Sequence, residues 1–218
     1  MNSNIRQKEL LFQTEKYIKQ HFAGEGTGHD WWHISRVRNL SKQISKEEGG
    51  NNFIIEMAAL LHDLDDWKLI DHEDNARAKA WLKKMDISET NALKILEIIE
   101  QVSFKGAGVE TKATSIEAKI VQDADRLDAI GAIGIARTFA YGGNKGRPIY
   151  DPEIKPEMHD SFEAYKKTTA PTINHFYEKL LLLQDLLNTK TAKKIAKNRH
   201  QFMENFLFQF FNEWEGKI

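Results

Sequence analysis

Residues 53–66 read FIIEMAALLHDLDD, and this stretch decides the fold. From Phe53 to Leu61 almost every residue is apolar, which is typical of a helix buried on all sides. The acidic groups that follow are costly to bury unless they are paired or bound to a metal. We therefore expect the polar residues from His62 to Asp66 to leave a buried helix and enter a cavity, and we expect chemistry at that end.

Apolar residues recur at three- and four-residue spacings on both sides of this stretch, and alternating strand-like runs are almost absent. The sequence therefore predicts an all-α protein, a compact helical bundle. The expected helices are one carrying Leu10 to Phe22, one from Asp30 to Gly49-Gly50, two that Asp74 and Ser88 cap and that run to about Met85 and Ser103, a long one over 115–141, and two closing helices over 172–187 and 190–214. Gly131 and Gly134 would allow a neighbouring helix to approach closely.

The 218 residues fit one domain, and no shift in composition marks a boundary. We expect a single domain over 1–218, with its motif core at about 29–130 and the C-terminal helices over 160–214 in the same domain. Residues 142–160 contain three of the four prolines and form the one long irregular segment. Loops of that length are often functional.

The charge balance excludes some functions. Lys and Arg number 31 against 32 Asp and Glu, so the formal charge of −1 gives no field that would attract nucleic acid or an anionic membrane. The chain has no cysteine, so any metal ligands must be nitrogen or oxygen atoms. The first twenty residues lack the apolar core of a signal peptide, and no apolar run approaches the roughly 20 residues that cross a bilayer. These features predict a cytoplasmic protein without a membrane partner.

Three predicted helices carry four residues that can supply metal ligands: His33, His62, Asp63 and Asp125. Divalent ions favour imidazole nitrogens and carboxylate oxygens that several rigid elements present together. Adjacent helical residues diverge by about 100°, so the His62-Asp63 pair can share only an ion that faces other helices. A packed bundle provides that position, and the sequence predicts a metal site between helices.

Three ordered motifs carry a family resemblance: HISRV at 33–37, LLHDLDD at 60–66 and DADRLDAIG at 123–131. This pattern resembles the HD superfamily of metal-dependent phosphohydrolases, whose signature is a His, a His-Asp pair and a distant Asp. The runs GHDWWHISRV, RTFAYGGNKGRPIYDP and NRHQFMENFLFQFFNEWEG resemble a bacterial branch associated with nucleotide pyrophosphohydrolase activity. The resemblance covers about the whole chain.

The resemblance implies how the ligands are chosen. It places the last ligand at Asp125, with Asp123 and Asp128 as supporting or capping groups. His33 is favoured over His29, which precedes the helix. Members of the superfamily with two metals recruit extra histidines between the His-Asp pair and the last Asp, and here that interval holds only His72. We therefore expect one divalent ion, manganese first, with magnesium, cobalt, nickel, iron or zinc as alternatives.

Further residues are candidates for catalysis and substrate binding. Asp66 follows Asp63 by about one helical turn and is expected to orient or deprotonate water, with Asp65 as its competitor. Phosphate chemistry also needs cations. We expect Lys68 to assist catalysis and Arg36, Lys145 and Arg147 to bind the phosphates. Structural ion pairs are expected for Arg126 and Arg137, while Trp31, Trp32 and Tyr141 could stack a base but are more simply explained as core.

The expected activity is hydrolysis of ribo- or deoxyribonucleoside triphosphates to a monophosphate and pyrophosphate. One alternative is a nucleotidase or a cyclic-nucleotide phosphodiesterase that uses the same site, and another is a non-catalytic metal- or ligand-sensing module. The expected partner is a small phosphorylated substrate, with no nucleic acid bound, and a homodimer is left open.

Overall fold

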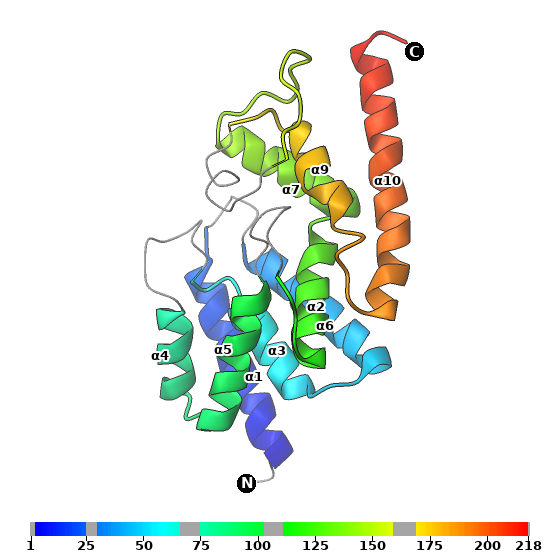
Figure 1. Ribbon diagram of the computed structural model, residues 1–218. Coiled ribbons are helices and arrows are strands. Elements are labelled where there is room, and N and C mark those ends of the chain that lie inside the picture. Colours follow the sequence, from blue (N-terminus) through cyan, green and yellow to red (C-terminus); the bar gives the residue numbers. More distant parts are fainter. Residues whose placement is uncertain (1–2, 25–29, 66–74, 103–110, 159–168, 218) are drawn as a thin grey trace. The chain divides into compact units, whose positions relative to one another are not determined.

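The computed structural model describes residues 3–24, 30–65, 75–102, 111–158 and 169–217 (Figure 1). Every regular element in these ranges is a helix and none is a strand, so the predicted all-α fold is confirmed. The described residues form two compact units, the first ending at Asp125 and the second beginning at Arg126. The single domain expected over 1–218 stays a prediction.

The first unit is built around a short helix that is buried on nearly every side. Its helices are α1 (Ser3–His21), α2 (Trp31–Glu48), α3 (Asn52–Leu61), α4 (Ala76–Lys84), α5 (Glu89–Val102) and the part of α6 (Ile116–Asp128) up to Asp125. Helix α3 packs against α1, α2 and α5. Eight of its ten residues are buried, as the apolar run from Phe53 predicts.

Capping residues set the ends of the two helices that lead to the functional site. The Asp30 carboxylate accepts a hydrogen bond from the His33 amide at 2.9 Å, so α2 begins where the sequence predicts. At its other end, Gly49 has a φ of +83°, a left-handed conformation that glycine adopts without strain. The Asn51 side chain accepts from the amides of Phe53 and Ile54 and caps α3.

Side-chain contacts link α1 to other helices of the first unit. The Arg38 guanidinium of α2 donates to Glu15 of α1 at 2.7 Å and to Glu56 of α3 at 2.9 Å. The indole of Trp81 in α4 stacks on Tyr17 with the ring centroids 3.9 Å apart. Together these contacts join α1 to α2, α3 and α4.

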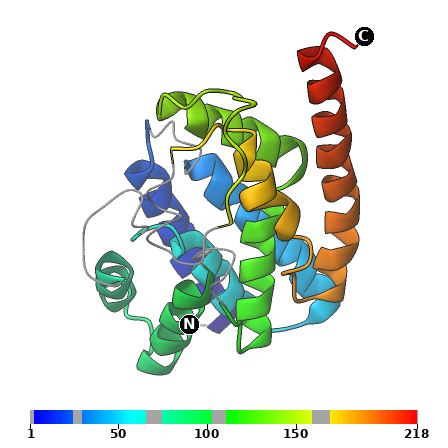
Figure 2. The same ribbon diagram turned by 45° about the horizontal axis from the view of Figure 1, so that its top comes forward.

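The second unit contains α7 (Gly131–Asn144), α9 (Asn174–Glu178), the 3-10 helix η1 (Leu180–Leu182) and α10 (Lys190–Trp214). Helix α10 is the longest of these and packs against α7 (Figure 2). Aromatic rings fill this contact: Phe206 stacks on Phe176, with Phe139 beside both. The bounds of α10 match the predicted helix over 190–214.

The prediction of one continuous helix over 115–141 is wrong, because the helix is interrupted between α6, which ends at Asp128, and α7, which begins at Gly131. Ile130 is extended and Gly131 has a φ of +78°, which an L side chain rarely adopts. A Cβ at Gly131 would lie 3.0 Å from the Cβ of Arg199, so the predicted close approach of a neighbouring helix is confirmed there. At Gly134 the close atom is the carbonyl oxygen of Ala129, in the same chain segment.

The predicted helix over 172–187 is also interrupted, because Lys179 leaves the helical region with φ −145° and ψ −59°. Helix α5 begins at Glu89, directly after the predicted cap Ser88. The structure gives Asn75 as the residue before α4, and the predicted cap Asp74 and helix end Ser103 lie outside the described residues. No helix among the described residues is both long and apolar enough to span a membrane.

Candidate metal centre

Three segments of the first unit bring two imidazoles and two carboxylates together. His33 is the third residue of α2, His62 and Asp63 lie in the turn after α3, and Asp125 lies on α6. His33, His62 and Asp63 are buried, whereas the Asp125 side chain is 26% exposed. All four predicted ligands therefore meet in one place, with Asp125 on the more open side.

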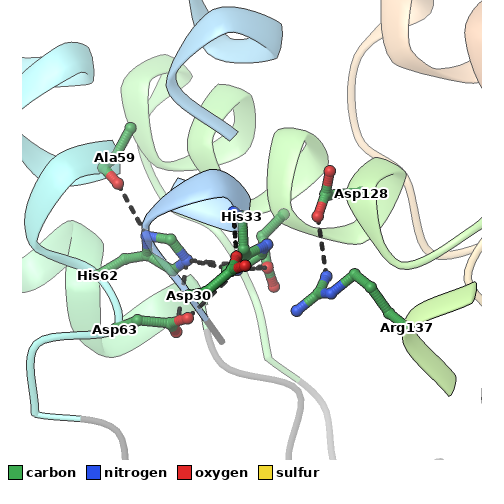
Figure 3. A network of polar contacts seen from close by, with 8 residues as sticks. Asp30, His33, Ala59, His62, Asp63, Asp128 and Arg137 are labelled. Atoms are coloured by element: carbon green, nitrogen blue, oxygen red, sulfur yellow. Dashed lines mark hydrogen bonds and ion pairs between the residues drawn. The ribbon is translucent and has the colours of Figure 1, made fainter. Parts of the chain in front are cut away.

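Short distances connect these groups through the Nε2 atoms of the histidines (Figure 3). The two Nε2 atoms are 3.3 Å apart. Nε2 of His33 lies 3.2 Å from a carboxylate oxygen of Asp63 and 3.4 Å from one of Asp125. The corresponding distances from Nε2 of His62 are 3.4 Å and 3.8 Å.

The ring of His62 is oriented by a backbone carbonyl. Its Nδ1 lies 2.8 Å from the carbonyl oxygen of Ala59. Because a carbonyl can only accept, this contact places the proton of the neutral ring on Nδ1 and leaves a lone pair on Nε2. A second hydrogen bond of this kind is typical of histidines that bind metals.

The donor set fits a divalent ion. Ligand atoms that each bind one ion at about 2.1 Å lie roughly 3.0–3.4 Å apart at the usual angles. The atoms of His33, His62 and Asp63 all lie within 4.8 Å of one another and form a compact set. Asp125 is outside that set, yet its oxygen lies within 3.8 Å of both imidazoles. The cluster can therefore hold a metal ion, with Asp125 as the most adjustable ligand.

The other aspartates of the third motif have different surroundings. Asp128 belongs to the second unit and pairs with Arg137 at 2.9 Å, which confirms the structural ion pair expected for that arginine. Asp123 is fully buried. Arg126 donates to the carbonyl oxygen of Leu186, a contact that the sequence did not predict. Of the aspartates in this motif, Asp125 lies within 3.8 Å of both histidine rings, and Asp128 pairs with Arg137.

Asp65, the predicted competitor of Asp66, is already engaged. Its two carboxylate oxygens accept hydrogen bonds from the backbone amides of Arg77 and Ala78, at 3.1 Å and 2.9 Å. Sequence reasoning missed this contact, because the chain folds back across twelve residues to make it. The predicted catalytic residues Asp66 and Lys68, like His29 and His72, lie outside the described residues.

The predicted substrate contacts lie in both units. Arg36 is half-buried on α2, one turn after His33. In the second unit, Lys145 and Arg147 each place their cationic group within 6 Å of the Tyr141 ring centroid. Arg36 belongs to the first unit, whereas Lys145 and Arg147 belong to the second. That all three bind one substrate stays a prediction.

The aromatic residues next to His33 differ in exposure. Trp31 is buried, which agrees with a place in the core, and the Lys19 ammonium lies 6.0 Å from its ring centroid. Trp32 is 62% exposed, so the core explanation is wrong for this residue.

Comparison with known proteins identifies the family. A model of the HD domain matches residues 31–130, which include all four ligand candidates. The chain is 45% identical to an HD-superfamily hydrolase from Bacillus thuringiensis of known structure, covering 96% of this chain and 98% of that one, with a TM-score of 0.74. The chain therefore belongs to the HD superfamily, as the motifs predict.

Two further solved structures are similar over nearly their full lengths. A protein from Lactobacillus plantarum has 40% identity and a TM-score of 0.86, covering 94% of this chain and 97% of that one. YpgQ of Bacillus subtilis, whose structure was determined in complex with ADP, has 36% identity and a TM-score of 0.74, covering 93% and 97%. The fold of this chain is that of the HD superfamily.

Proposed function

We propose that this protein is a divalent-metal-dependent phosphohydrolase that converts nucleoside triphosphates to monophosphates and pyrophosphate. The observation that carries the proposal is the convergence of His33, His62, Asp63 and Asp125 within 3.8 Å contacts. A divalent ion held by these residues, manganese in the first instance, would lower the pKa of a water molecule and polarise a phosphoryl oxygen.

The chain's own residues contribute binding and orientation. The Ala59 carbonyl holds the His62 ring with Nε2 turned toward the other ligands. Arg36 follows His33 by one turn on the same helix and is proposed to contact a phosphate. We assign Lys145 and Arg147 to the polyphosphate as well, because their paired positive charges match it. Roles for Asp66 and Lys68 stay predictions.

The substrate class receives support from a relative. YpgQ was crystallised with ADP, a nucleotide with the linkage that we propose is cleaved in triphosphates. The exposed ring of Trp32 beside His33 is available to contact a base. The cytoplasmic location and the homodimer stay predictions.

A substrate panel with manganese tests both the reaction class and the linkage. Ribo- and deoxyribonucleoside triphosphates, monophosphates and cyclic nucleotides are incubated with the protein, and monophosphate, phosphate, pyrophosphate and nucleoside are followed separately. We expect equal amounts of monophosphate and pyrophosphate from triphosphates only. Nucleoside with phosphate would instead indicate a nucleotidase, and turnover of cyclic nucleotides a phosphodiesterase.

Isotope labelling and matched variants make the test sharper. Hydrolysis in ¹⁸O-water is expected to label the monophosphate, because water attacks the α-phosphorus and pyrophosphate leaves. Replacement His62→Ala should reduce turnover at least about 100-fold, consistent with loss of a metal ligand. His200→Ala, which alters a histidine paired with Glu204 on α10, should leave turnover unchanged. Metal binding by the wild type without turnover of any substrate would favour the sensing module.

A further inference from the structure

Asp65 caps a helix that is distant from it in sequence. The residue before α4, Asn75, is left-handed and its side chain makes no capping hydrogen bond. The donors that such a cap would satisfy are instead bound by Asp65, whose Oδ1 accepts from the Arg77 amide and whose Oδ2 accepts from the Ala78 amide. Both oxygens of this carboxylate are therefore used at the start of α4, where a negative charge is also favoured by the helix dipole.

The same residue lies in the turn that carries two of the candidate ligands. His62 is held at one side by the Ala59 carbonyl. Leu64 is buried, and its amide donates to the carbonyl of Leu61 at 3.1 Å. Asp63 thus lies between His62, whose ring is oriented by the Ala59 carbonyl, and Asp65, which is hydrogen-bonded to the start of α4.

Helix α4 is in turn held against α1 by the side chain of Trp81. The Trp81 indole stacks on Tyr17 with an interplanar angle of 6°, and its Nε1 donates to the Thr14 hydroxyl at 3.0 Å. Thr14 is fully buried on α1. A hydrogen bond from Asp65 to α4 therefore ties the ligand-bearing turn to the α1 scaffold rather than to a loose segment.

We propose that Asp65 is a positioning residue for the metal centre, and this inference rests on the proposed function. By fastening the turn from His62 to Asp65 onto the first turn of α4, it keeps the Asp63 carboxylate directed toward His33 and His62. Its loss frees that carboxylate and lowers the affinity for the ion without removing any ligand.

The test separates positioning from ordinary helix capping. Full-length Asp65→Ala and Asp65→Asn are compared with Asn51→Ala, because Asn51 also accepts from two backbone amides, at the opposite end of α3. Manganese affinity is measured by titration calorimetry, and thermal stability is measured on the same samples. Amide exchange at Arg77 and Ala78 reports whether the contact has been lost.

We expect Asp65→Ala to weaken manganese binding about 10-fold, in the range found for groups that orient ligands. Asp65→Asn, which keeps one acceptor oxygen, should recover part of this loss and covers the case in which the alanine variant does not fold. Asn51→Ala should lower the melting temperature and leave manganese affinity within about twofold, since no ligand is oriented from that end.

Two results would overturn the inference in different ways. Wild-type manganese affinity in both Asp65 variants, with faster exchange at Arg77 and Ala78, would leave Asp65 as a helix cap only. Absence of manganese binding in the wild-type protein would overturn the metal centre itself, and the role of Asp65 with it.

Discussion

The Nε2 atoms of His33 and His62 lie 3.3 Å apart, although the two residues are 29 positions apart in the chain. One is placed by the capped start of α2 and the other by the turn that follows the buried α3. Two nitrogens that face each other with carboxylates around them are stabilised by a shared cation. This pair of rings is therefore the centre of the proposed site.

Asp125 and Asp128 should respond differently to loss of charge. Asp125→Asn removes a carboxylate that lies within 3.8 Å of both imidazoles, so manganese affinity should fall at least about 10-fold. Asp128→Asn weakens the buried pair with Arg137 and should cost about 1.5–3 kcal/mol of stability. Calorimetric titration and denaturant unfolding measure the two effects. A stronger loss of manganese affinity in Asp128→Asn would reverse the assignment.

Trp81 should stabilise the protein through its contacts with α1. Its indole stacks on Tyr17 and donates to Thr14, so Trp81→Ala should lower the free energy of unfolding by about 3–5 kcal/mol. Trp81→Phe keeps a ring but loses the hydrogen bond, and a smaller loss of about 1 kcal/mol is expected from that contact. Urea unfolding curves provide both values. Equal losses in the two variants would show that the ring itself contributes little.

Gly131 and Gly143 form a matched pair of glycines in α7. Gly131→Ala introduces a Cβ at φ +78° and 3.0 Å from Arg199, and should cost about 1–2 kcal/mol. At Gly143 a Cβ would meet nothing within 4 Å, so Gly143→Ala should be neutral or stabilising by up to about 1 kcal/mol. Thermal unfolding of the two variants checks the contrast, and an unchanged stability of Gly131→Ala would contradict it.

The pKa of His21 should lie below its ordinary value of 6.5. Partial burial is the main cause and the charge of Arg77 adds to it, while Asp65 acts in the opposite direction. Since the unfolded chain then binds the proton more readily, the contribution of His21 to stability is complete above pH 6.5 and declines as pH falls through the folded pKa. An NMR titration of His21 measures the shift. Arg77→Ala should raise this pKa, and an unchanged value would exclude the arginine as a cause.

The parts of the fold that the sequence predicted well depend on local signals. Helix α2 was predicted from the Asp30 cap and the Gly49-Gly50 end, and α10 from its apolar spacing. Both signals act within a few residues. The break at Ile130 was missed, because a glycine such as Gly131 can lie inside a helix or begin one in a left-handed conformation. The close contact of Gly131 with Arg199, which is distant in sequence, gives no local signal.

The candidate site shows the same division. The ordered motifs predicted His33, His62, Asp63 and Asp125, and the structure brings these four side chains together. The supporting contacts were not predicted, since the Asp65 interaction with α4 joins residues that no short motif connects. The ordered motifs and their resemblance to the HD superfamily therefore indicated the ligands, whereas the orientation of the ligands depends on tertiary contacts.

Anomalous diffraction at the manganese edge, from crystals of the wild-type protein grown with manganese chloride, tests the central claim most directly. The account predicts one strong peak per chain, within bonding distance of Nε2 of His33 and His62 and of the carboxylates of Asp63 and Asp125. A peak bound by other residues, or no peak among these four in a fully manganese-saturated crystal, would contradict it.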